Sequence, residues 1–534
     1  MSKQLPLLIF LLTATIFSIL YQGYHPIQSD LLVFSPYLAK LLNPGLFPKD
    51  FAIDAMVSNF PGLMWKLLVP ISIFINPDSL LLFLHAFTRF LFYTSLFVVA
   101  TVISGNKRIG YLTVLFWFIP KPSIAYDTLS NVFVQSQLAT PLIVFSFVSF
   151  LYGRSLTSGL ILGFVFYIHQ PLALPAAAFV GLGFILTKQL GKLFNFTLMF
   201  LAVVSPLIPQ IITVVFNSGS YDNQWLEIIR IRNSHHLFPS LWTIDQWLPT
   251  TLVFVMFLVA YFQERKNKVA LSVTTVKVLL FGPTVVILLA IIFTELIPIR
   301  KVIMSAPFHI GNLSLVFPSI IIAMFLYRMV TSKDKGEKLL GFSLSYVFFF
   351  IQFSLKIQRA FLLFAIPTML LVNRYKNNPR KLFVATVLLL IFWMPYLFYK
   401  NQIKLGKQTN DWVSVQVWAR NNTPPNSVFI VPTYIDGFRM YSERSIFADW
   451  SDGALGLFHP SFIHEWWNRM ELLGITKTKN NQTSRKIAYD NLDEIMIRTI
   501  KERYKVDFIV IDAGNNLSFV KIYNNKGYSI YHVE

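Results

Sequence analysis

The sequence predicts a mainly α-helical membrane protein of many spans, with a small α/β domain at its C-terminal end. Hydrophobic residues make up 54% of the 534 positions and charged residues only 13%, and the mean hydropathy is +0.56. These values are far too apolar for a soluble protein. The apolar runs are roughly 15 to 23 residues long, too long and too little alternating for barrel strands, so the spans are helices. After Lys400 the hydrophobic runs shorten and turn residues become frequent.

The chain divides at that change into a multi-span region, 1–399, and a tail, 400–534. We expect thirteen spans, near 5–21, 79–103, 109–121, 132–151, 156–169, 171–187, 193–216, 246–262, 278–294, 308–329, 339–354, 358–372 and 382–399. The N-terminal apolar run 7–20 is not followed by a small-x-small cleavage site, which favours an uncleaved first helix over a signal peptide.

The distribution of charge orients these spans. The net charge is +20, but the tail is nearly balanced, so most of the excess lies between the predicted spans. All six connectors on one side of the predicted bundle contain Lys or Arg, which marks that side as cytoplasmic. We therefore expect a plasma-membrane protein with a cytoplasmic N-terminus and an extracytoplasmic tail. This distribution does not indicate a nucleic-acid partner. The chain has no cysteine, which excludes disulfides and thiolate chemistry.

The first outer loop, 22–78, is long and mixes acidic with apolar and aromatic residues, as in short amphipathic helices on a membrane face. Its run 60–75 is short, is broken by Pro70 and contains Lys66. Counting this run as a span would reverse the side of every later basic loop, so we expect it to be interfacial or re-entrant.

The tail pattern predicts alternating helices and strands. Helices are expected over 410–421, 459–473 and 490–504, strands over 427–432, 445–449 and 507–512, and a hairpin over 519–533. The turn sequence Asn524-Asn-Lys-Gly527 supports the hairpin.

Three carboxylates fall in outer loops: Asp30 in the first, Asp127 in the second and Glu295 in the fifth. A carboxylate near the membrane boundary is costly unless it is used or paired, so Asp30 is the first candidate for a general base. The alternative is a solvated interfacial carboxylate. Together the three are also candidate ligands for a divalent cation such as Mg²⁺ or Mn²⁺. Asp127 and Glu295 each have a simpler explanation, since Lys121 is a nearby counterion for Asp127 and Arg300 for Glu295.

Basic and histidine residues form a second group of candidates. The segment 230–236 contains Arg230, Arg232, His235 and His236, a composition that suits a phosphate or pyrophosphate headgroup. The alternative is a basic loop that meets anionic lipid.

Two further arginines could contact the same phosphate. Arg89 stands one turn from His85 inside a predicted span, where a charge is expensive unless it binds a ligand or a neighbouring helix. Arg359 lies between two outer helix ends.

The tail offers carboxylates beside tryptophans. Asp452 and its neighbours Asp436 and Asp449 lie close in sequence to Trp450, Trp466 and Trp467. Aromatic faces paired with carboxylate acceptors suit a saccharide. The same cluster equally suits a domain that docks its aromatic residues on the membrane.

This layout resembles the GT-C superfamily of integral-membrane glycosyltransferases, which use polyprenyl-phosphate-linked sugars. The resemblance covers nearly the whole chain: a cytoplasmic N-terminus, a long first outer loop with an early carboxylate, about thirteen spans and an outward α/β tail. It implies Asp30 as the first-loop catalytic aspartate, Asp127 as the second-loop carboxylate and Glu295 as the fifth-loop glutamate. The chain departs from the family pattern in having one aspartate rather than an acidic pair in the second loop. Trp450-Ser-Asp-Gly is only faintly similar to the Trp-Trp-Asp signature of the oligosaccharyltransferases.

We expect a membrane glycosyltransferase that moves a sugar from a polyprenyl-phosphate donor to a lipid, glycan or protein acceptor outside the cell membrane. Asp30 would act as the general base, and Arg230, Arg232 or Arg359 would hold the departing phosphate. Two alternatives stay open. One is a translocator of lipid or polysaccharide precursors, and the other is an inactive GT-C-like protein that serves assembly.

Overall fold

The computed structural model describes residues 4–26, 28–59, 62–119, 129–209, 212, 222–265, 273–350, 410–478 and 480–534. Two compact units make up the chain, and both are discontinuous in sequence. The helical unit combines Met1–Tyr24, Leu82–Pro206 and His235–Lys404. The sheet unit combines His25–Leu81, Leu207–Ser234 and Leu405–Glu534. The segment 25–81, which contains most of the predicted first outer loop, thus belongs to the same unit as the tail.

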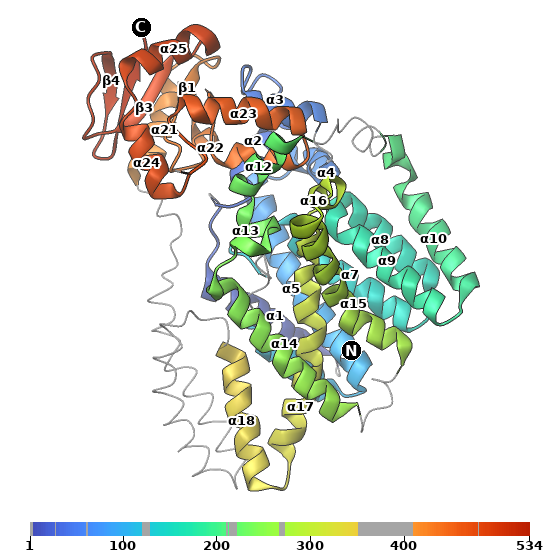
Figure 1. The fold of residues 1–534 in the computed structure, drawn as a ribbon. Helices are drawn as coiled ribbons and strands as arrows, with labels where there is room; N and C mark the ends of the chain where they lie inside the picture. Colours follow the sequence, from blue (N-terminus) through green and yellow to red (C-terminus); the bar gives the residue numbers. More distant parts are fainter. Residues whose placement is uncertain are drawn as a thin grey trace. The chain divides into compact units, whose positions relative to one another are not determined.

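The helical unit contains most of the apolar helices (Figure 1). Its described elements are α1 (Leu5–Gln22), α5 (Pro77–Ser104, which begins in the sheet unit), α6 (Lys107–Phe116), α7 (Gln135–Leu151), α8 (Ser155–Ile168), α9 (Gln170–Leu186), α10 (Leu190–Val204), α13 (Ser234–Leu237), α14 (Ile244–Glu264), α15 (Thr274–Ile291), α16 (Arg300–Met304), α17 (Leu313–Thr331) and α18 (Lys335–Phe350). Short 3-10 and π turns extend several of these helices.

Six helices of the described chain are long and apolar enough to cross a membrane, which is the composition of a membrane protein. They are Leu5–Gln22, Pro77–Ser104, Leu190–Leu207, Gln246–Glu264, Thr274–Leu296 and Pro307–Thr331. Other predicted spans correspond to shorter helices, and α6 is only about 15 Å long. The predicted spans 358–372 and 382–399 lie outside the described residues.

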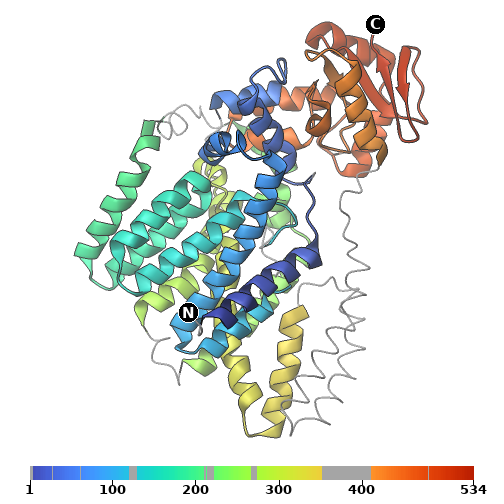
Figure 2. The same ribbon diagram turned by 180° about the vertical axis from the view of Figure 1, so that it is seen from behind.

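Small residues and one arginine join the helices of this unit. Gly159 and Gly163 of α8 face α10, where a Cβ on Gly159 would come within 2.5 Å of the Phe196 carbonyl oxygen. Such small residues allow close helix packing in membranes. Arg89 of α5 donates to Ser18 Oγ at 2.8 Å and also to the Gln22 side chain of α1, the dark blue helix in Figure 2.

The sheet unit is built around a five-stranded sheet of order β2-β1-β3-β5-β4. Its strands are β1 (Val428–Ile430), β2 (Ser445–Ile446), β3 (Phe508–Asp512), β4 (Val520–Asn524) and β5 (Tyr528–His532). β1 pairs in parallel with β2 and β3, whereas β3, β5 and β4 pair antiparallel. The predicted strands and hairpin are confirmed, although β2 ends at Ile446, before Asp449.

Helices of the tail bury much of this sheet: strands β1, β3 and β5 are largely buried, whereas the edge strand β4 is mostly exposed. α21 (Asn410–Asn422) places Trp412, Val415 and Ala419 in one core with Phe429, Phe508 and other strand residues. The remaining helices of the tail are α22 (Arg439–Ser442), α23 (Pro460–Leu472), α24 (Gln482–Asp490) and α25 (Glu494–Tyr504), with a 3-10 turn, η6, over Ser451–Leu457.

Three helices of the first outer loop and one later helix complete the unit: α2 (Leu31–Leu42), α3 (Phe51–Asn59), α4 (Leu63–Ser72) and α12 (Asn223–Arg232). Phe51 of α3 stacks on Phe462 of α23 with ring centroids 4.5 Å apart. Trp225 of α12 donates its indole N–H to the Gly456 carbonyl at 2.9 Å. Segments far apart in sequence therefore share one core.

Candidate functional site

The polar centre of the sheet unit lies where its parallel strands end. Asp436 follows β1 and Asp449 follows β2, so both leave the carboxyl edge of the parallel strands. β1 lies between β2 and β3 in the sheet. After β1 the chain forms β2 on one side of it, and later β3 on the other side. Ligands of open α/β sheets bind outside such an edge, at the point where the strand order reverses. This edge is the candidate site.

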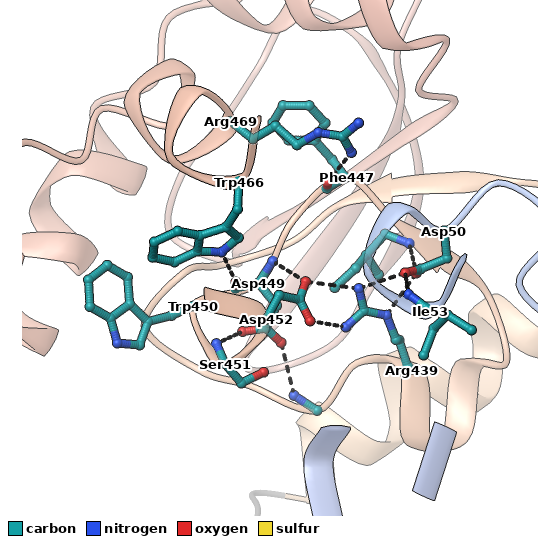
Figure 3. Close-up of polar contacts among 12 residues, drawn as sticks. Asp50, Ile53, Arg439, Phe447, Asp449, Trp450, Ser451, Asp452, Trp466 and Arg469 are labelled. Atoms are coloured by element: carbon teal, nitrogen blue, oxygen red, sulfur yellow. Dashed lines mark hydrogen bonds and ion pairs between the residues drawn. The ribbon is translucent and has the colours of Figure 1, made fainter. Parts of the chain in front are cut away.

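Arg439 bridges two buried carboxylates of this region (Figure 3). Its Nε and Nη2 donate to the Asp50 carboxylate at 2.7 and 2.9 Å, and its Nη1 and Nη2 donate to Asp452 at 2.7 and 2.9 Å. All three side chains are buried. Two bidentate contacts use four of the five N–H groups of a guanidinium, so Arg439 is fully committed to these partners.

The carboxylates of Asp50 and Asp452 also accept hydrogen bonds from backbone N–H groups. Asp50 accepts from the N–H groups of Ile53 at 3.1 Å and Ile446 at 3.0 Å, and Asp452 accepts from the N–H of Asp449 at 3.0 Å. Burial raises the pKa of Asp452 to about 6, against the opposing effect of Arg439. Asp452, which the sequence suggested for substrate binding, is thus a buried partner of Arg439.

Asp449 closes the turn that contains Trp450. Its carboxylate accepts from the Ser451 N–H at 3.1 Å and the Gly437 N–H at 3.4 Å, and its backbone carbonyl accepts from the Trp466 indole at 2.9 Å. Burial raises the pKa of Asp449 well above its usual value, and the neighbouring Asp436 carboxyl, which bonds to it, raises that pKa further. Both effects favour the protonated form of the Asp449 carboxyl in the folded protein.

Trp450 lies between two arginines. The Arg485 guanidinium is 4.3 Å from the indole centroid and the Arg232 guanidinium is 5.7 Å from it. Arg232 also donates to the carbonyl oxygens of Trp450 at 2.8 Å and Ser451 at 3.3 Å. Burial lowers the pKa of Arg232, whereas Asp436, Asp449, Asp452 and Asp30 raise it. Arg232 therefore links α12 to the Trp450 turn and faces a group of carboxylates.

Asp30 stands at the N-terminus of α2, and its side chain makes no capping bond to that helix. The residue is exposed to solvent. Desolvation nevertheless raises the pKa of Asp30, with Arg232 opposing the shift. A carboxylate that solvent can reach can also meet a substrate. Asp30 therefore combines access with a pKa shifted toward neutrality.

The sequence-predicted residues are divided between the two units. Asp30, Arg230, Arg232 and Asp452 lie in the sheet unit, with Arg230 half-buried in α12. Arg89, His235, His236 and Glu295 lie in the helical unit. Asp127 and Arg359 lie outside the described residues.

The candidates in the helical unit have partners of their own. Glu295 Oε1 accepts from the Ser240 N–H at 2.9 Å. The ring centroids of the adjacent residues His235 and His236 lie 3.8 Å apart, with the ring planes tilted by 43°. Besides its contacts with α1, Arg89 donates to His85 Nε2 at 3.3 Å and to the Ser130 carbonyl.

A divalent cation gains no support from the part of the chain that the structure describes. Within that part, no group of three His, Cys, Asp or Glu residues is placed to hold a metal ion. Asp30 and Glu295 belong to different units. The third predicted ligand, Asp127, lies outside the described residues, so the cation site stays a prediction.

The proposed aromatic surface of the tail is partly wrong. Trp466 and Trp467 are 0% and 1% exposed, so both belong to the core and present no face to a saccharide or to lipid. Gly453 allows this packing, since a Cβ there would lie 2.5 Å from the Trp466 ring. Only the half-buried Trp450 is partly accessible among these three tryptophans.

Sequence reasoning missed Arg439 and Arg485. Arg439 lies in a short segment flanked by Phe438 and Met440, and a lone arginine between apolar residues is the only signal that the sequence offers. Its partner Asp50 is 389 positions away, so the pairing is not readable without the fold.

The comparison with known families covers part of this region. A family model described as a domain of unknown function (DUF6798) matches residues 410–473. This segment runs from α21 to the end of α23 and includes Arg439, Asp449 and Asp452. No curated protein matches the chain.

Proposed function

We propose that the protein is a membrane glycosyltransferase that uses a polyprenyl-phosphate-linked sugar and acts on the outer side of the cytoplasmic membrane. The acceptor is a lipid, a glycan or a protein. The observation that carries the proposal is Asp30: an exposed carboxylate whose pKa is raised by its surroundings, in one compact unit with Arg232 and Arg230.

The three chain segments that form the sheet unit support the expected topology. Its three segments, 25–81, 207–234 and 405–534, form one compact unit. A compact unit outside the bilayer lies on one side, so the chain must cross the membrane an even number of times between these segments. The proposed thirteen spans place six crossings in each interval. The basic loops assign the opposite side to the cytoplasm, which leaves the sheet unit outside.

In the proposed reaction, the Asp30 carboxylate takes the proton of the acceptor hydroxyl. The hydroxyl oxygen then attacks the anomeric carbon, and the bond from that carbon to the phosphate oxygen breaks. The electron pair leaves with the polyprenyl phosphate, and the anomeric configuration inverts. A base is most effective when its pKa lies near the working pH, so the raised pKa of Asp30 favours this role.

The departing phosphate needs positive charge. Arg230 and Arg232 occupy the last turn of α12, and Arg359 remains a proposed contributor. Arg232 also donates to two carbonyl oxygens, which hold its guanidinium in place, and we assign the phosphate contact to Arg230 and Arg232 together. Asp127 and Glu295 keep their proposed roles as further loop carboxylates.

The contacts of Arg89 favour an enzyme over a translocator of lipid or polysaccharide precursors. A path for a charged headgroup needs polar groups that line it. Arg89 is the charged residue most deeply placed in α5, and it is 1% exposed and bonded to α1 and to the Ser130 carbonyl. These bonds explain it as a link between helices.

Turnover tests the proposal. The full chain, purified into lipid nanodiscs and given a panel of polyprenyl-phosphate sugars with glycan and peptide acceptors, should release polyprenyl phosphate only when a suitable acceptor is present. Release without transfer to the acceptor, or no release with any donor of the panel, would favour the assembly-protein alternative.

A further inference from the structure

α4 has two apolar faces, and among the residues that the structure describes only one of these faces is covered. Met64, Trp65 and Leu68 are buried. Trp65 stacks on Phe34 of α2 with ring centroids 5.1 Å apart and planes 18° apart. These contacts fix α4 against the helix that begins at Asp30.

The opposite face is uncovered. Leu67 and Ile71, one helical turn apart, are 55% and 42% exposed, and Ile73, Phe74 and Ile75 directly after the helix are 70%, 87% and 46% exposed. These five residues are called the outer ridge below. A contiguous row of large apolar side chains is costly to leave in water, because burial of each one is favourable.

The chain itself indicates what covers the outer ridge. α5 begins at Pro77, only two residues after Ile75, and contains a candidate membrane span. Its 28 residues reach about 42 Å, whereas a bilayer core is roughly 30 Å thick, so the first turn of a spanning α5 lies within about 12 Å of the core. Phe74 is three residues from Pro77, at most about 11 Å of extended chain.

The neighbouring residues suit that position. Lys66 is exposed beside Leu67, and lysine next to aromatic and aliphatic side chains is typical of the interface between lipid headgroups and acyl chains. A soluble protein partner would have to cover the ridge within reach of the lipid surface, which the bilayer already occupies.

We propose that the outer ridge inserts into the membrane leaflet next to the sheet unit and thereby holds the N-terminus of α2 at the depth of the lipid headgroups. The second part rests on the proposed function, because it sets the height of Asp30 relative to a lipid-linked phosphate. Phe34, which stacks on Trp65, lies one turn after Asp30, and its N–H donates to the Asp30 carbonyl at 2.9 Å.

Site-directed labelling tests the insertion without any assay of activity. The natural chain contains no cysteine, so Phe74→Cys and Ile495→Cys each carry one bimane label. Ile495 of α25 is 78% exposed in the same unit and serves as the matched control. In nanodiscs with doxyl-labelled lipid, we expect several-fold stronger quenching at position 74 than at 495, and the reverse order with aqueous iodide.

Two outcomes would overturn the insertion. Strong iodide quenching at position 74, equal to that at 495, would mean that the ridge lies in water. Protection of position 74 from both quenchers would mean that protein, not lipid, covers it. Leu67→Cys repeats the measurement one turn earlier in case the first variant does not fold.

The positioning role has a separate readout. Phe74→Lys should raise the KM for the lipid-linked donor several-fold with little change in kcat, whereas Ile495→Lys should change neither. An unchanged KM beside strong lipid quenching would remove the positioning role and keep the insertion. If the wild-type protein shows no turnover at all, the proposed function fails while the quenching result stands.

Discussion

Arg439 of α22 forms a double bidentate contact with Asp50, 389 positions earlier in the chain, and with Asp452. This contact ties the first outer loop to the tail. α2, which begins at Asp30, also packs against α22 and η6. The position of Asp30 therefore depends on the folded tail.

Removal of Arg439 should destabilise the sheet unit severely. Arg439→Met leaves two buried carboxylates without a counterion, a change that costs about 3–5 kcal/mol. Arg420→Met is the control, because the Arg420–Glu443 pair is largely exposed and such pairs are worth about 1 kcal/mol or less. Limited proteolysis and thermal unfolding of the full chain in detergent measure both. Equal effects of the two substitutions would contradict the assigned role of Arg439.

The close packing of η6 on α23 predicts that a larger residue at position 456 destabilises the sheet unit. A Cβ on Gly456 would lie 2.0 Å from Ile463 Cδ1, so Gly456→Ala should cost about 1–3 kcal/mol through overpacking. A Cβ on Gly514 would meet nothing within 4 Å, and Gly514→Ala should be nearly neutral. Thermal unfolding distinguishes the two. A stable Gly456→Ala protein would mean that η6 and α23 are not packed as described.

Asp449 should make stability fall as pH rises. Its raised pKa means that the folded state binds its proton more tightly than the unfolded state, so the stabilising effect is complete below about pH 4 and is lost as pH increases through the folded-state pKa. Asp436 raises this pKa, whereas Arg439 and the Ser451 N–H lower it. The substitution Asp449→Asn replaces one carboxylate oxygen, a hydrogen-bond acceptor, at every pH. It also removes the ionisable group, so the pH dependence due to Asp449 disappears.

The melting temperatures of wild type and Asp449→Asn at pH 5 and pH 8 test this sign. We expect the destabilisation by Asp449→Asn to be smaller at pH 8, by about 1.4 kcal/mol for every tenfold difference in proton affinity between the folded and unfolded states. If Asp449→Asn destabilises the protein more at pH 8 than at pH 5, Asp449 is ionised in the folded protein.

Orientation can be measured with single cysteines. Val520→Cys, at an exposed position on the edge strand β4, should react with a membrane-impermeant maleimide on intact cells. Lys107→Cys, exposed at the start of α6, should react only after the membrane is permeabilised. Labelling of both positions in intact cells, or of Lys107→Cys alone, would reverse or abolish the proposed topology.

The sequence predicted local elements well and long-range partners poorly. Apolar runs predicted α1, α5 and α17, and turn residues predicted the β4–β5 hairpin, because these signals depend on near neighbours. Asp50 and Arg439 are 389 positions apart, and Trp466 is buried against the nearby turn that contains Asp449 and Gly453. No helical or strand periodicity encodes either contact. Asp30 was found because it follows the first span, but its raised pKa and its relation to Arg232 required the structure.

A matched pair of substitutions in the first outer loop tests the central claim most directly. Asp54, like Asp30, is exposed and has a raised pKa, and it lies in α3 of the same unit. Asp30→Asn should lower the rate of sugar transfer by at least about 100-fold, as expected for loss of a general base, while the melting temperature is unchanged and Asp54→Asn retains activity. Undiminished transfer by Asp30→Asn, or equal losses in both variants, would contradict the account.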